Sequence, residues 1–359
     1  MSKTLSALST EGIADKVVTW QKEYGRNSLP WQNTQDPYRV WLSEIMLQQT
    51  QVATVREYFE RFTRRLPTVA DLAQASADEV MGLWSGLGYY SRARNLHRCA
   101  QIVMHEHGGQ FPKQAALLQT LPGIGRSTAA AIASLCFGER VAILDANVKR
   151  VLTRLLAFDG DLAQATHERA LWALAQSLVP GEKAGPQAMA RYTQGMMDLG
   201  ATVCLARKPQ CKQCPLQNDC RAHATASMES FPVRSRKLKR SSQSLWLLWA
   251  QDAQGAVWLA RRPVPGVWAG LHCLPVFDSE AQLQAALPAN SRRRLVAMDS
   301  FLHVLTHKDL HIHPMFIALS AAARMPALQG DWVSKEDWPS LGLPAPVRQL
   351  LEASRPLKA

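Results

Sequence analysis

Four cysteines stand close together in a chain whose other thiols are scattered. Cys204, Cys211, Cys214 and Cys220 lie within seventeen residues, a density typical of a metal site rather than of a disulfide framework. Four thiolates suit either a structural zinc ion or a [4Fe–4S] cluster. Zinc ribbons usually present two close pairs separated by a longer loop, whereas the spacers here are six, two and five residues. The compact spacing therefore favours the cluster.

Two acidic residues occupy positions from which a carboxylate can act on a ligand. Glu44 lies on an otherwise apolar helical stripe, and a buried acid is costly unless it is paired or protonated. Asp145 follows the apolar run 141–144, which would place its carboxylate at the edge of a buried cleft. Each residue also has a simpler interpretation. Glu44 can be a surface residue at the rim of the stripe, and Asp145 can be the N-cap of the next helix.

A glycine hairpin precedes Asp145. Gly123 and Gly125, in the stretch Leu-Pro-Gly-Ile-Gly, permit a tight turn and a close approach of the backbone to a partner. The amides at the start of the next helix, at Arg126 and Ser127, would then point outward and form an anion site. In a basic protein the expected anion is a phosphodiester. The alternative is a helix–turn–helix corner that only packs one helix onto another.

Two further stretches carry side chains suited to nucleic acid. Gln48, Gln49 and Thr50 place uncharged hydrogen-bonding groups at a helix end. Residues 86–90, Gly-Leu-Gly-Tyr-Tyr, offer a flexible backbone with two aromatic rings, one of them Tyr89, and arginines follow. Aromatic rings interleaved with arginine suit stacking on bases and contacts with phosphates. The alternative is an ordinary basic helix face with core tyrosines.

Composition points to the same class of partner. The chain of 359 residues has a formal net charge of +12 and a pI near 9.6, which favours a polyanion, most simply nucleic acid. No apolar run approaches the length needed to span a bilayer, and the first ten residues lack the pattern of a signal peptide. We therefore expect a soluble, intracellular protein of two or three domains.

The elements that must position these residues fall into two patterns. Up to residue 225 the periodicity predicts an all-helical domain, with Gly200 as a helix C-cap and 141–144 as its longest strand. A basic, polar passage, 226–244, is typical of a linker. Residues 245–355 then predict a mixed α+β domain, with paired strands at 245–250 and 256–260 and another strand at 310–319. The expected fold class is thus multidomain, an all-α domain followed by an α+β domain.

Several motifs together resemble a known family. They are Leu-Pro-Trp at 29–31, Val-Trp-Leu-Ser-Glu at 40–44, Met-Leu-Gln-Gln-Thr-Gln at 46–51, Gly-Leu-Gly-Tyr-Tyr at 86–90 and Met-Met-Asp-Leu-Gly-Ala at 196–201. With the hairpin, Asp145 and the cysteine tail, they resemble the helix-hairpin-helix, iron–sulfur DNA glycosylases. Within that superfamily the chain is similar to the MutY adenine DNA glycosylases. The resemblance runs from about residue 12 to 225 and recurs in the second domain.

The resemblance implies a function in base excision repair. Members of this family excise adenine mispaired with 8-oxoguanine or guanine, after flipping the base out of the stack, and leave an abasic site. The implied cofactor is a [4Fe–4S] cluster, and the implied partner is double-stranded DNA with an A:8-oxoguanine or A:G mispair. We expect a monomer in the cytoplasm, associated with the nucleoid through DNA. The helix-hairpin-helix would occupy about 114–137, the iron–sulfur module about 204–220, and a Nudix-like domain for 8-oxoguanine recognition 245–355.

The resemblance also assigns roles to residues. Glu44 matches the acid that protonates adenine and then activates water, Asp145 matches the carboxylate that stabilises the oxocarbenium ion, and Asn147 matches the amide that orients this centre. The adenine pocket would be lined by Arg26, Trp31 and Gln194. DNA would be contacted by Gln48, Gln49, Thr50, Tyr89, Gly123, Gly125, Arg126, Ser127 and Lys149. The four cysteines would hold the cluster, and Thr306 and His307 would recognise 8-oxoguanine.

Ser127 bears on the type of reaction. In the related endonuclease III branch a lysine at this hairpin position forms a Schiff base and permits strand cleavage. Serine supplies no such amine, so the resemblance implies a monofunctional glycosylase. The chain departs from the family pattern at Ala146, where glycine is usual, and at Leu305-Thr306-His307, which replaces Phe-Ser-His. The second departure keeps a hydroxyl and an imidazole but loses an aromatic ring.

Two other functions compete with this interpretation. A bifunctional pyrimidine glycosylase would share the helical fold, but Ser127 and the additional domain argue against it. A non-catalytic iron–sulfur protein that scans DNA or senses redox state would keep the hairpin and the cysteines. It would have no need of Glu44 and Asp145 together.

Overall fold

The structure, a computed structural model, describes residues 12–235, 240–320 and 328–353. It divides into two compact units. The first, here called the helical unit, comprises residues 1–73 and 98–237, and the second, the sheet unit, comprises 74–97 and 238–359. This grouping differs from the predicted division into 1–225 and 245–355, because residues 74–97 group by their contacts with the C-terminal part of the chain. Hydrophobic periodicity identifies helices but not the partner that each helix covers.

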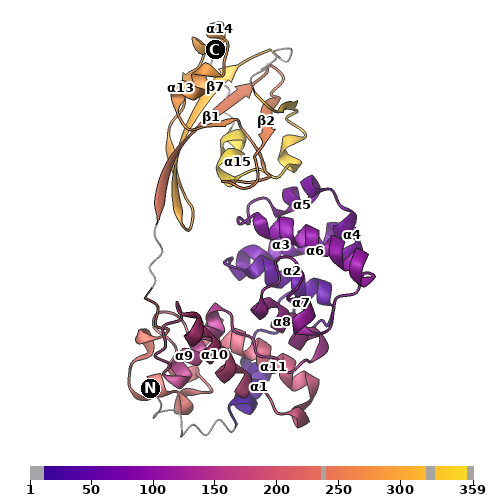
Figure 1. Cartoon of the computed structure of the whole chain (residues 1–359), viewed down its shortest axis with the longest axis vertical. Coiled ribbons are helices and arrows are strands. Elements are labelled where there is room, and N and C mark those ends of the chain that lie inside the picture. Colours follow the sequence, from indigo (N-terminus) through magenta and orange to yellow (C-terminus); the bar gives the residue numbers. More distant parts are fainter. Residues whose placement is uncertain (1–11, 236–239, 321–327, 354–359) are drawn as a thin grey trace. The chain divides into compact units, whose positions relative to one another are not determined.

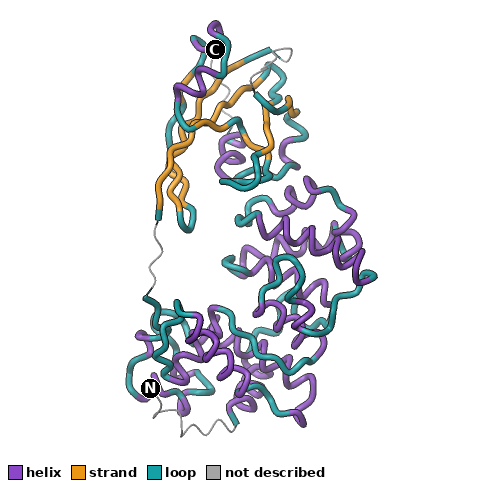
Figure 2. The backbone as a smooth tube through the Cα atoms, viewed as in Figure 1, coloured by secondary structure: helices purple, strands orange, loops and turns teal. Residues whose placement is uncertain are grey.

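The helical unit consists of short helices joined by tight loops (Figures 1 and 2). Asp36 caps α2 through a hydrogen bond from the amide of Tyr38, with Pro37 in the first turn, as Asp-Pro predicts. In chain order the α-helices with residues in this unit are α1 (Ile13–Tyr24), α2 (Pro37–Leu47), α3 (Val52–Arg65), α4 (Val69–Gln74), α6 (Ser91–His107), α7 (Ala115–Leu118), α8 (Arg126–Phe137), α9 (Ala146–Leu156), α10 (Ala165–Ser177), α11 (Gly185–Asp198) and α12 (Arg221–Ala224).

The core of this unit fixes the start of α9. Apolar side chains of α1, α9, α10 and α11 pack into one buried cluster, which includes Ile13, Val17, Val148, Val151, Leu152, Leu155, Leu171, Met189 and Met196. Each fully buried side chain of this size contributes roughly 1.5–3 kcal/mol. Asp145 and Asn147 lie at the N-terminal end of α9, so this packing holds them in place.

Two local predictions for the helical unit are wrong. Residues 141–144 form no strand; the amide of Ala142 donates instead to Oε1 of Gln176 at 2.9 Å, because no strand lies beside it in the part of the unit that the structure describes. Gly200 is not a C-cap either, since α11 continues into a π-turn, η2 (Leu199–Val203). A Cβ on Gly200 would lie 2.5 Å from Cβ of Asn147. Glycine is therefore present because this turn packs closely against α9.

The sheet unit is organised around two long parallel strands, β1 (Ser241–Gln251) and β7 (Lys308–Ala318), paired from Ser241↔Lys308 to Gln251↔Ala318. The other strands are β2 (Val257–Arg261), β3 (His272–Cys273), β4 (Val276–Phe277), β5 (Val296–Ala297), β6 (Phe301–Val304) and β8 (Asp331–Val333). β2 and β6 pair antiparallel with β1 and β7 respectively. Helix α13 (Glu280–Ala285) covers one face, where Leu283 packs against Leu248 and Ile317.

The predicted linker, 226–244, is shorter in the structure. β1 begins at Ser241, so the last residues of that passage belong to the sheet. Its first part packs on the helical unit, where the amide of Leu162 donates to the carbonyl of Val233 at 3.1 Å. The basic residues at 236–239 lie outside the described residues.

Residues 74–97 are held in the sheet unit by hydrogen bonds to the C-terminal segment. They include α5 (Ala77–Trp84), and the unit's last helix is α15 (Ala345–Glu352). The hydroxyls of Ser85 and Tyr90 both donate to the carbonyl of Leu343, at 3.2 and 2.9 Å, and Nη1 of Arg94 donates to the carbonyl of Ala269 at 2.6 Å. None of the helices that the structure describes is long and apolar enough to cross a membrane.

Candidate active site

Glu44 and Asp145 come from two different helices of the helical unit. Glu44 lies on α2 among buried neighbours, and burial together with the charge of Asp145 raises its pKa from 4.5 to about 7, against the opposing effect of Arg26. The charge of Asp145 thus reaches Glu44, although the two residues lie 101 positions apart in the sequence. Glu44 is thus partly protonated at neutral pH and can both give and accept a proton.

Asp145 is the N-cap of α9, and its Oδ1 accepts a hydrogen bond from the amide of Val148 at 2.7 Å. Burial raises the pKa of Asp145, while the amides of Val148 and Asn147 and the positive charges of Arg150 and Lys149 oppose that rise. The structure therefore shows the predicted capping role of Asp145; neither Asp145 nor Glu44 is among the residues that line the cleft described below. Amide donors and cations favour the carboxylate form, which suits a group that stabilises a cation.

Arg26 and Gln194, two of the predicted pocket residues, are joined by a third residue. Nε and Nη2 of Arg26 both lie 2.7 Å from Oδ1 of Asp198, the amide of Arg26 donates to its Oδ2 at 2.9 Å, and Nε2 of Gln194 donates to its Oδ1 at 2.9 Å. Asp198 was not among the predicted site residues. The available signal was its position four residues after Gln194, on the same helix face and within the Met-Met-Asp motif.

The predicted pocket residues line one cleft in the helical unit. Arg26, Trp31 and Gln194 lie on its wall with residues 134–138, and its volume is about 690 Å³. Trp31 is buried and packs edge-on against the ring of Phe59, with 5.4 Å between centroids. Pockets for small ligands commonly measure roughly 300–1,000 Å³. The cleft is therefore large enough for a purine base.

Asn147 is tied to the cysteine segment through Arg150. Nη2 of Arg150 donates to Oδ1 of Asn147 at 2.9 Å and also to the carbonyl of Gly200, and its Nε donates to the carbonyl of Cys204 at 2.7 Å. One guanidinium thus connects the first turn of α9, the π-turn and the first of the clustered cysteines. Arg150 was also absent from the predicted site, because nothing in its local sequence indicates these distant partners.

The four clustered cysteines line one cavity in the helical unit, together with apolar side chains and the buried Arg154. Nη1 of Arg154 donates to Sγ of Cys204 at 3.4 Å and to the carbonyl of Leu205 at 2.6 Å. Burial raises the pKa of Cys214 to about 12 and also raises the pKa values of Cys211 and Cys220. Thiolates in this cavity therefore need a bound cation to be stable.

Four clustered thiolates can hold either one zinc ion or an iron–sulfur cluster. Thiolates on one zinc ion lie about 3.8 Å apart, as tetrahedral geometry with Zn–S bonds of about 2.3 Å requires. The four thiols share one cavity, so they are placed for a common metal site.

The hairpin has the geometry that its glycines predict. Gly123 has a φ of 77°, and Gly125 is the exposed N-cap of α8, which begins at Arg126. The guanidinium of Arg126 lies 4.0 Å above the ring of Trp172. Oγ of Ser127 is buried without a hydrogen-bond partner among the described residues. The hairpin occupies 121–125 between α7 and α8, within the predicted helix-hairpin-helix.

Several of the predicted DNA-contacting residues bond to other parts of the protein. Nε2 of Gln48 lies 3.5 Å from Oγ1 of Thr128 on α8, whose first residues follow the hairpin. Gln49 is exposed and has a positive φ of 57°, and Oγ1 of Thr50 donates to the carbonyl of Gln48 at 3.3 Å. Lys149 forms an ion pair with Glu168. Its amine is therefore already engaged by a carboxylate.

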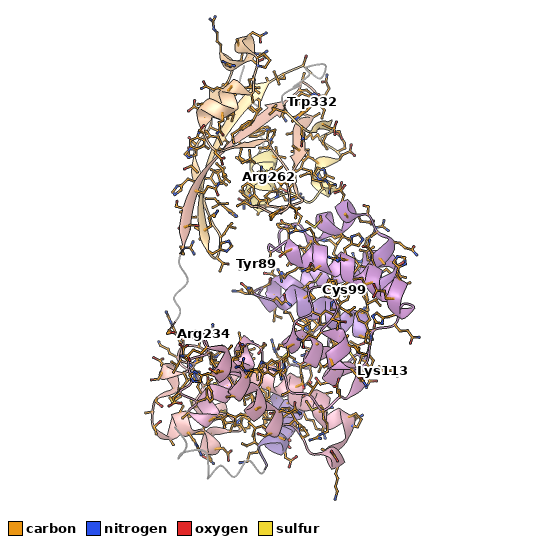
Figure 3. The ribbon with its side chains drawn as sticks, in the orientation of Figure 1. Tyr89, Cys99, Lys113, Arg234, Arg262 and Trp332 are labelled. Carbon is orange, nitrogen blue, oxygen red and sulfur yellow. The ribbon has the colours of Figure 1, made fainter. Side chains whose placement is uncertain are left out.

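The sheet unit brings together three further predicted residues. The hydroxyls of Tyr89, labelled in Figure 3, and Thr306 are in contact. Both residues lie with His307 and Trp268 on the wall of a second cleft, whose volume is about 690 Å³. Thr306 and His307 are exposed. The structure therefore assembles the predicted recognition loop beside a tyrosine that is far away in the sequence.

Comparison with known proteins places these features in a family. Residues 42–177 match the family described as HhH-GPD superfamily base excision DNA repair protein, and residues 246–353 match the NUDIX domain. An adenine DNA glycosylase of Buchnera aphidicola subsp. Acyrthosiphon pisum (strain APS) is 35% identical over 343 residues, which cover 94% of this chain and 95% of the relative. The adenine DNA glycosylase of Homo sapiens is 44% identical over 224 residues, which cover 60% of this chain and 40% of the relative.

Among solved structures, a thermostable thymine-DNA glycosylase aligns with a TM-score of 0.52 and 29% identity, covering 60% of this chain and 97% of that one. The comparisons confirm the predicted fold class, a helical glycosylase domain followed by an α+β NUDIX domain. They also confirm the predicted resemblance, because the match to the Buchnera relative extends over nearly the whole of both chains. This chain belongs to the adenine DNA glycosylase family.

Proposed function

We propose that this protein hydrolyses the N-glycosidic bond of adenine mispaired with 8-oxoguanine or guanine in duplex DNA, and leaves an abasic site for base excision repair. The observation that carries this proposal is the pairing of Glu44, whose pKa is raised to about 7, with Asp145 at the start of α9. Cleavage of a glycosidic bond requires one group that protonates the leaving group and another that stabilises the oxocarbenium ion.

Glu44 and Asp145 divide these two tasks. Protonated Glu44 gives its proton to N7 of the flipped adenine, and the C1′–N9 bond breaks as its electron pair moves to the base. The carboxylate of Asp145 stabilises the positive charge at C1′. Glu44, now ionised, accepts a proton from water as the water oxygen bonds to C1′. The proton given to the base is thus replaced by one taken from water.

The cleft is linked to Glu44 through Arg26, which lines it and lowers the pKa of Glu44 by its charge, and its walls support recognition of the base. Asp198 holds Arg26 and Gln194 by hydrogen bonds, so both side chains are oriented before a ligand enters. Trp31 adds an aromatic wall. Preorganised donors lower the entropic cost of binding, and a flipped purine suits a pocket of this size and polarity.

The hairpin chemistry supports a monofunctional reaction. Ser127 has no amine with which to form a Schiff base, and the amine of Lys149 is paired with Glu168. Water therefore remains the nucleophile that completes the reaction, and the phosphodiester backbone stays intact. The exposed Gly123 and Gly125, at the start of α8, support contact with a backbone phosphate.

The cysteine cavity is proposed to hold a [4Fe–4S] cluster through Cys204, Cys211, Cys214 and Cys220. When bound, such a cluster supplies four iron–thiolate bonds that fold the segment 204–220 around it and a one-electron redox centre. Arg154 donates to Sγ of Cys204 and offsets negative charge on the thiolates. Arg150 then links this segment to Asn147.

The sheet unit is proposed to recognise 8-oxoguanine through Thr306 and His307, next to Tyr89. The hydroxyl and imidazole groups can donate to and accept from the edge of the modified base. The partner is duplex DNA carrying the mispair, which the net charge of +12 favours. We further propose that the protein acts as a monomer in the cytoplasm, on nucleoid DNA.

A duplex cleavage assay tests the proposal. One duplex carries adenine opposite 8-oxoguanine and a second carries an oxidised pyrimidine, each incubated with the full-length protein with and without alkali. We expect breaks at the adenine only after alkali, and none with Asp145→Asn. Breaks without alkali, chiefly at the pyrimidine, would instead identify a bifunctional pyrimidine enzyme. Binding of both duplexes without any excision would leave only a scanning role.

A further inference from the structure

His223 has a ring nitrogen that neither the fold nor the proposed reaction accounts for. It lies on α12, three residues after Cys220, and its side chain lines the cavity that the four cysteines share. Nδ1 is buried and has no hydrogen-bond partner among the described residues. A buried polar atom without a partner is uncommon in folded proteins and calls for a ligand or a role.

The other ring nitrogen fixes the tautomer. Nε2 of His223 lies 3.1 Å from Nε2 of Gln217, and the amide group of a glutamine side chain can only donate from nitrogen. Nε2 of the imidazole therefore accepts, and the neutral ring carries its hydrogen on Nδ1. The buried, unpartnered atom is thus an N–H donor.

The cavity offers that donor few acceptors besides sulfur. Its apolar lining side chains, such as Val151, Leu155, Val203 and Leu216, cannot accept a hydrogen bond. Gln217 also lines the cavity, and its amide group lies at the other ring nitrogen of His223. The wall already contains one N–H···S contact, from Nη1 of Arg154 to Sγ of Cys204 at 3.4 Å. Nδ1 of His223, on α12, is a second N–H group at this cavity.

We propose that His223 donates a hydrogen bond from Nδ1 to a sulfur atom of the [4Fe–4S] cluster, and thereby sets its reduction potential. This inference rests on the cluster proposed above. It makes His223 a positioning and tuning residue rather than a ligand, for two reasons. Four thiolates already match four iron atoms, and a protonated Nδ1 has no lone pair to give to iron.

The expected direction of the effect follows from charge. A hydrogen bond to a cluster sulfur withdraws electron density from the metal centre and stabilises the more negative, reduced state. His223 should therefore raise the reduction potential, and Gln217 should act through it by holding the ring in the required tautomer. Neither side chain lies in the cleft that is proposed to bind the base.

The test compares three full-length variants with the wild type after iron and sulfide have been counted. His223→Phe removes the donor but keeps a ring against the cavity, and His223→Asn restores an N–H near the position of Nδ1. His105→Phe, at an exposed site on α6, is the matched control. The reduction potential is measured by direct electrochemistry. Pulsed EPR of the oxidised, paramagnetic cluster in protein labelled with [15N]histidine reports a nitrogen coupled to the cluster.

We expect His223→Phe to shift the potential to a more negative value, His223→Asn to reverse most of that shift, and His105→Phe to leave the potential unchanged. The labelled wild type should show a weak histidine nitrogen coupling that His223→Phe loses. The inference is overturned if the potential of His223→Phe matches that of His105→Phe, or if the wild type shows no such coupling. If His223→Phe fails to assemble a cluster, the coupling in the wild type still decides.

Failure of the cluster assignment would be distinguishable from failure of the hydrogen bond. A wild-type protein that contains zinc, or no iron and sulfide, would overturn the proposed [4Fe–4S] site itself. A wild-type protein with four irons per chain but no effect at His223 would overturn only the tuning role.

Discussion

Asp198 binds Arg26 through both carboxylate oxygens: Nε and Nη2 of the guanidinium lie 2.7 Å from Oδ1, and the backbone amide donates to Oδ2 at 2.9 Å. The side chain of Asp198 is 0% exposed, so its charge is balanced by Arg26 and Gln194 rather than by water. Removing one partner from such a buried pair leaves an uncompensated charge, which costs about 3–5 kcal/mol. The pair therefore supports both the fold and the shape of the cleft.

Asp198→Asn is expected to lower the single-turnover excision rate by about 100-fold, because a displacement of about 1 Å in a positioning group has an effect of this size. It should also lower the free energy of unfolding. Glu182→Gln is the control, since it breaks the exposed pair with Arg140 at 3.5 Å, worth at most about 1 kcal/mol. Equal excision rates for the two variants would show that Asp198 does not position the residues that bind the base.

Glu44→Gln should abolish excision at every pH, because an amide can neither give a proton to the base nor take one from water. In the wild type, single-turnover excision should fall as the pH rises above about 7, where Glu44 loses its proton. A single-turnover pH profile checks both statements. Residual activity with a shifted pH profile in Glu44→Gln would indicate a different acid.

The same substitution has an effect on stability whose sign follows from the pKa. Burial raises the pKa of Glu44 from 4.5 to about 7, so the stability due to its protonation is present below pH 4.5 and is lost as the pH rises through 7. Glu44→Gln should therefore be more stable than the wild type at pH 8, by at most about 3 kcal/mol. Urea unfolding at pH 5 and pH 8 should show this advantage shrinking at the lower pH.

Asp145→Asn separates capping from catalysis. Asparagine caps helices about as well as aspartate, whereas alanine costs about 1 kcal/mol. We therefore expect Asp145→Asn to keep the stability of the wild type and its affinity for mismatched DNA but to lose excision. Asp145→Ala should lose both excision and some stability. Full activity of the asparagine variant would exclude a catalytic carboxylate at this position.

Gly200→Ala tests the close packing of the π-turn on α9. The new Cβ would lie 2.5 Å from Cβ of Asn147, so the first turn of α9 must shift. We expect a loss of about 1–3 kcal/mol in the free energy of unfolding, together with slower excision. Gly181→Ala is the control, because no atom lies within 4 Å of its Cβ position. If both variants unfold alike, the contact with Asn147 is not tight.

Affinity for duplex DNA should fall steeply with salt, because contacts with phosphates release counterions. The logarithm of the association constant, measured by fluorescence anisotropy with Asp145→Asn, should decrease linearly with the logarithm of the salt concentration. Gly125→Asp, which places a negative charge at the exposed N-cap of α8, should weaken binding most at low salt. A flat salt response would contradict binding through phosphates.

Much of this architecture follows from local signals. Asp36-Pro37 and the hairpin glycines predict where α2 and α8 begin, because capping and turn chemistry depend only on neighbouring residues. The run 141–144 and Gly200 misled for the same reason. An apolar extended segment forms a strand only beside another strand, and a glycine near a helix end can serve close packing rather than capping.

The site divides in the same way. Glu44 and Asp145 could be predicted, because an acid in an apolar stripe and an acid before a helix are unusual in themselves. The role of Asp198 could not be predicted from the sequence, since its main partner, Arg26, lies 172 residues away. The role of Arg150 likewise depends on the carbonyl of Cys204, 54 residues along the chain. Pairings of this kind appear only when the chain is folded.

The contribution of residues 74–97 to the sheet unit has a consequence for truncated forms of the protein. A chain that stops at residue 237 loses Leu343, the acceptor for Ser85 and Tyr90, and also Ser340, whose carbonyl packs so closely that a Cβ on Gly82 would lie 2.0 Å from it. The hydroxyls of Ser85 and Tyr90 would then lose this hydrogen-bond acceptor. A premature stop codon in this region would thus remove these contacts of residues 74–97 as well as the sheet.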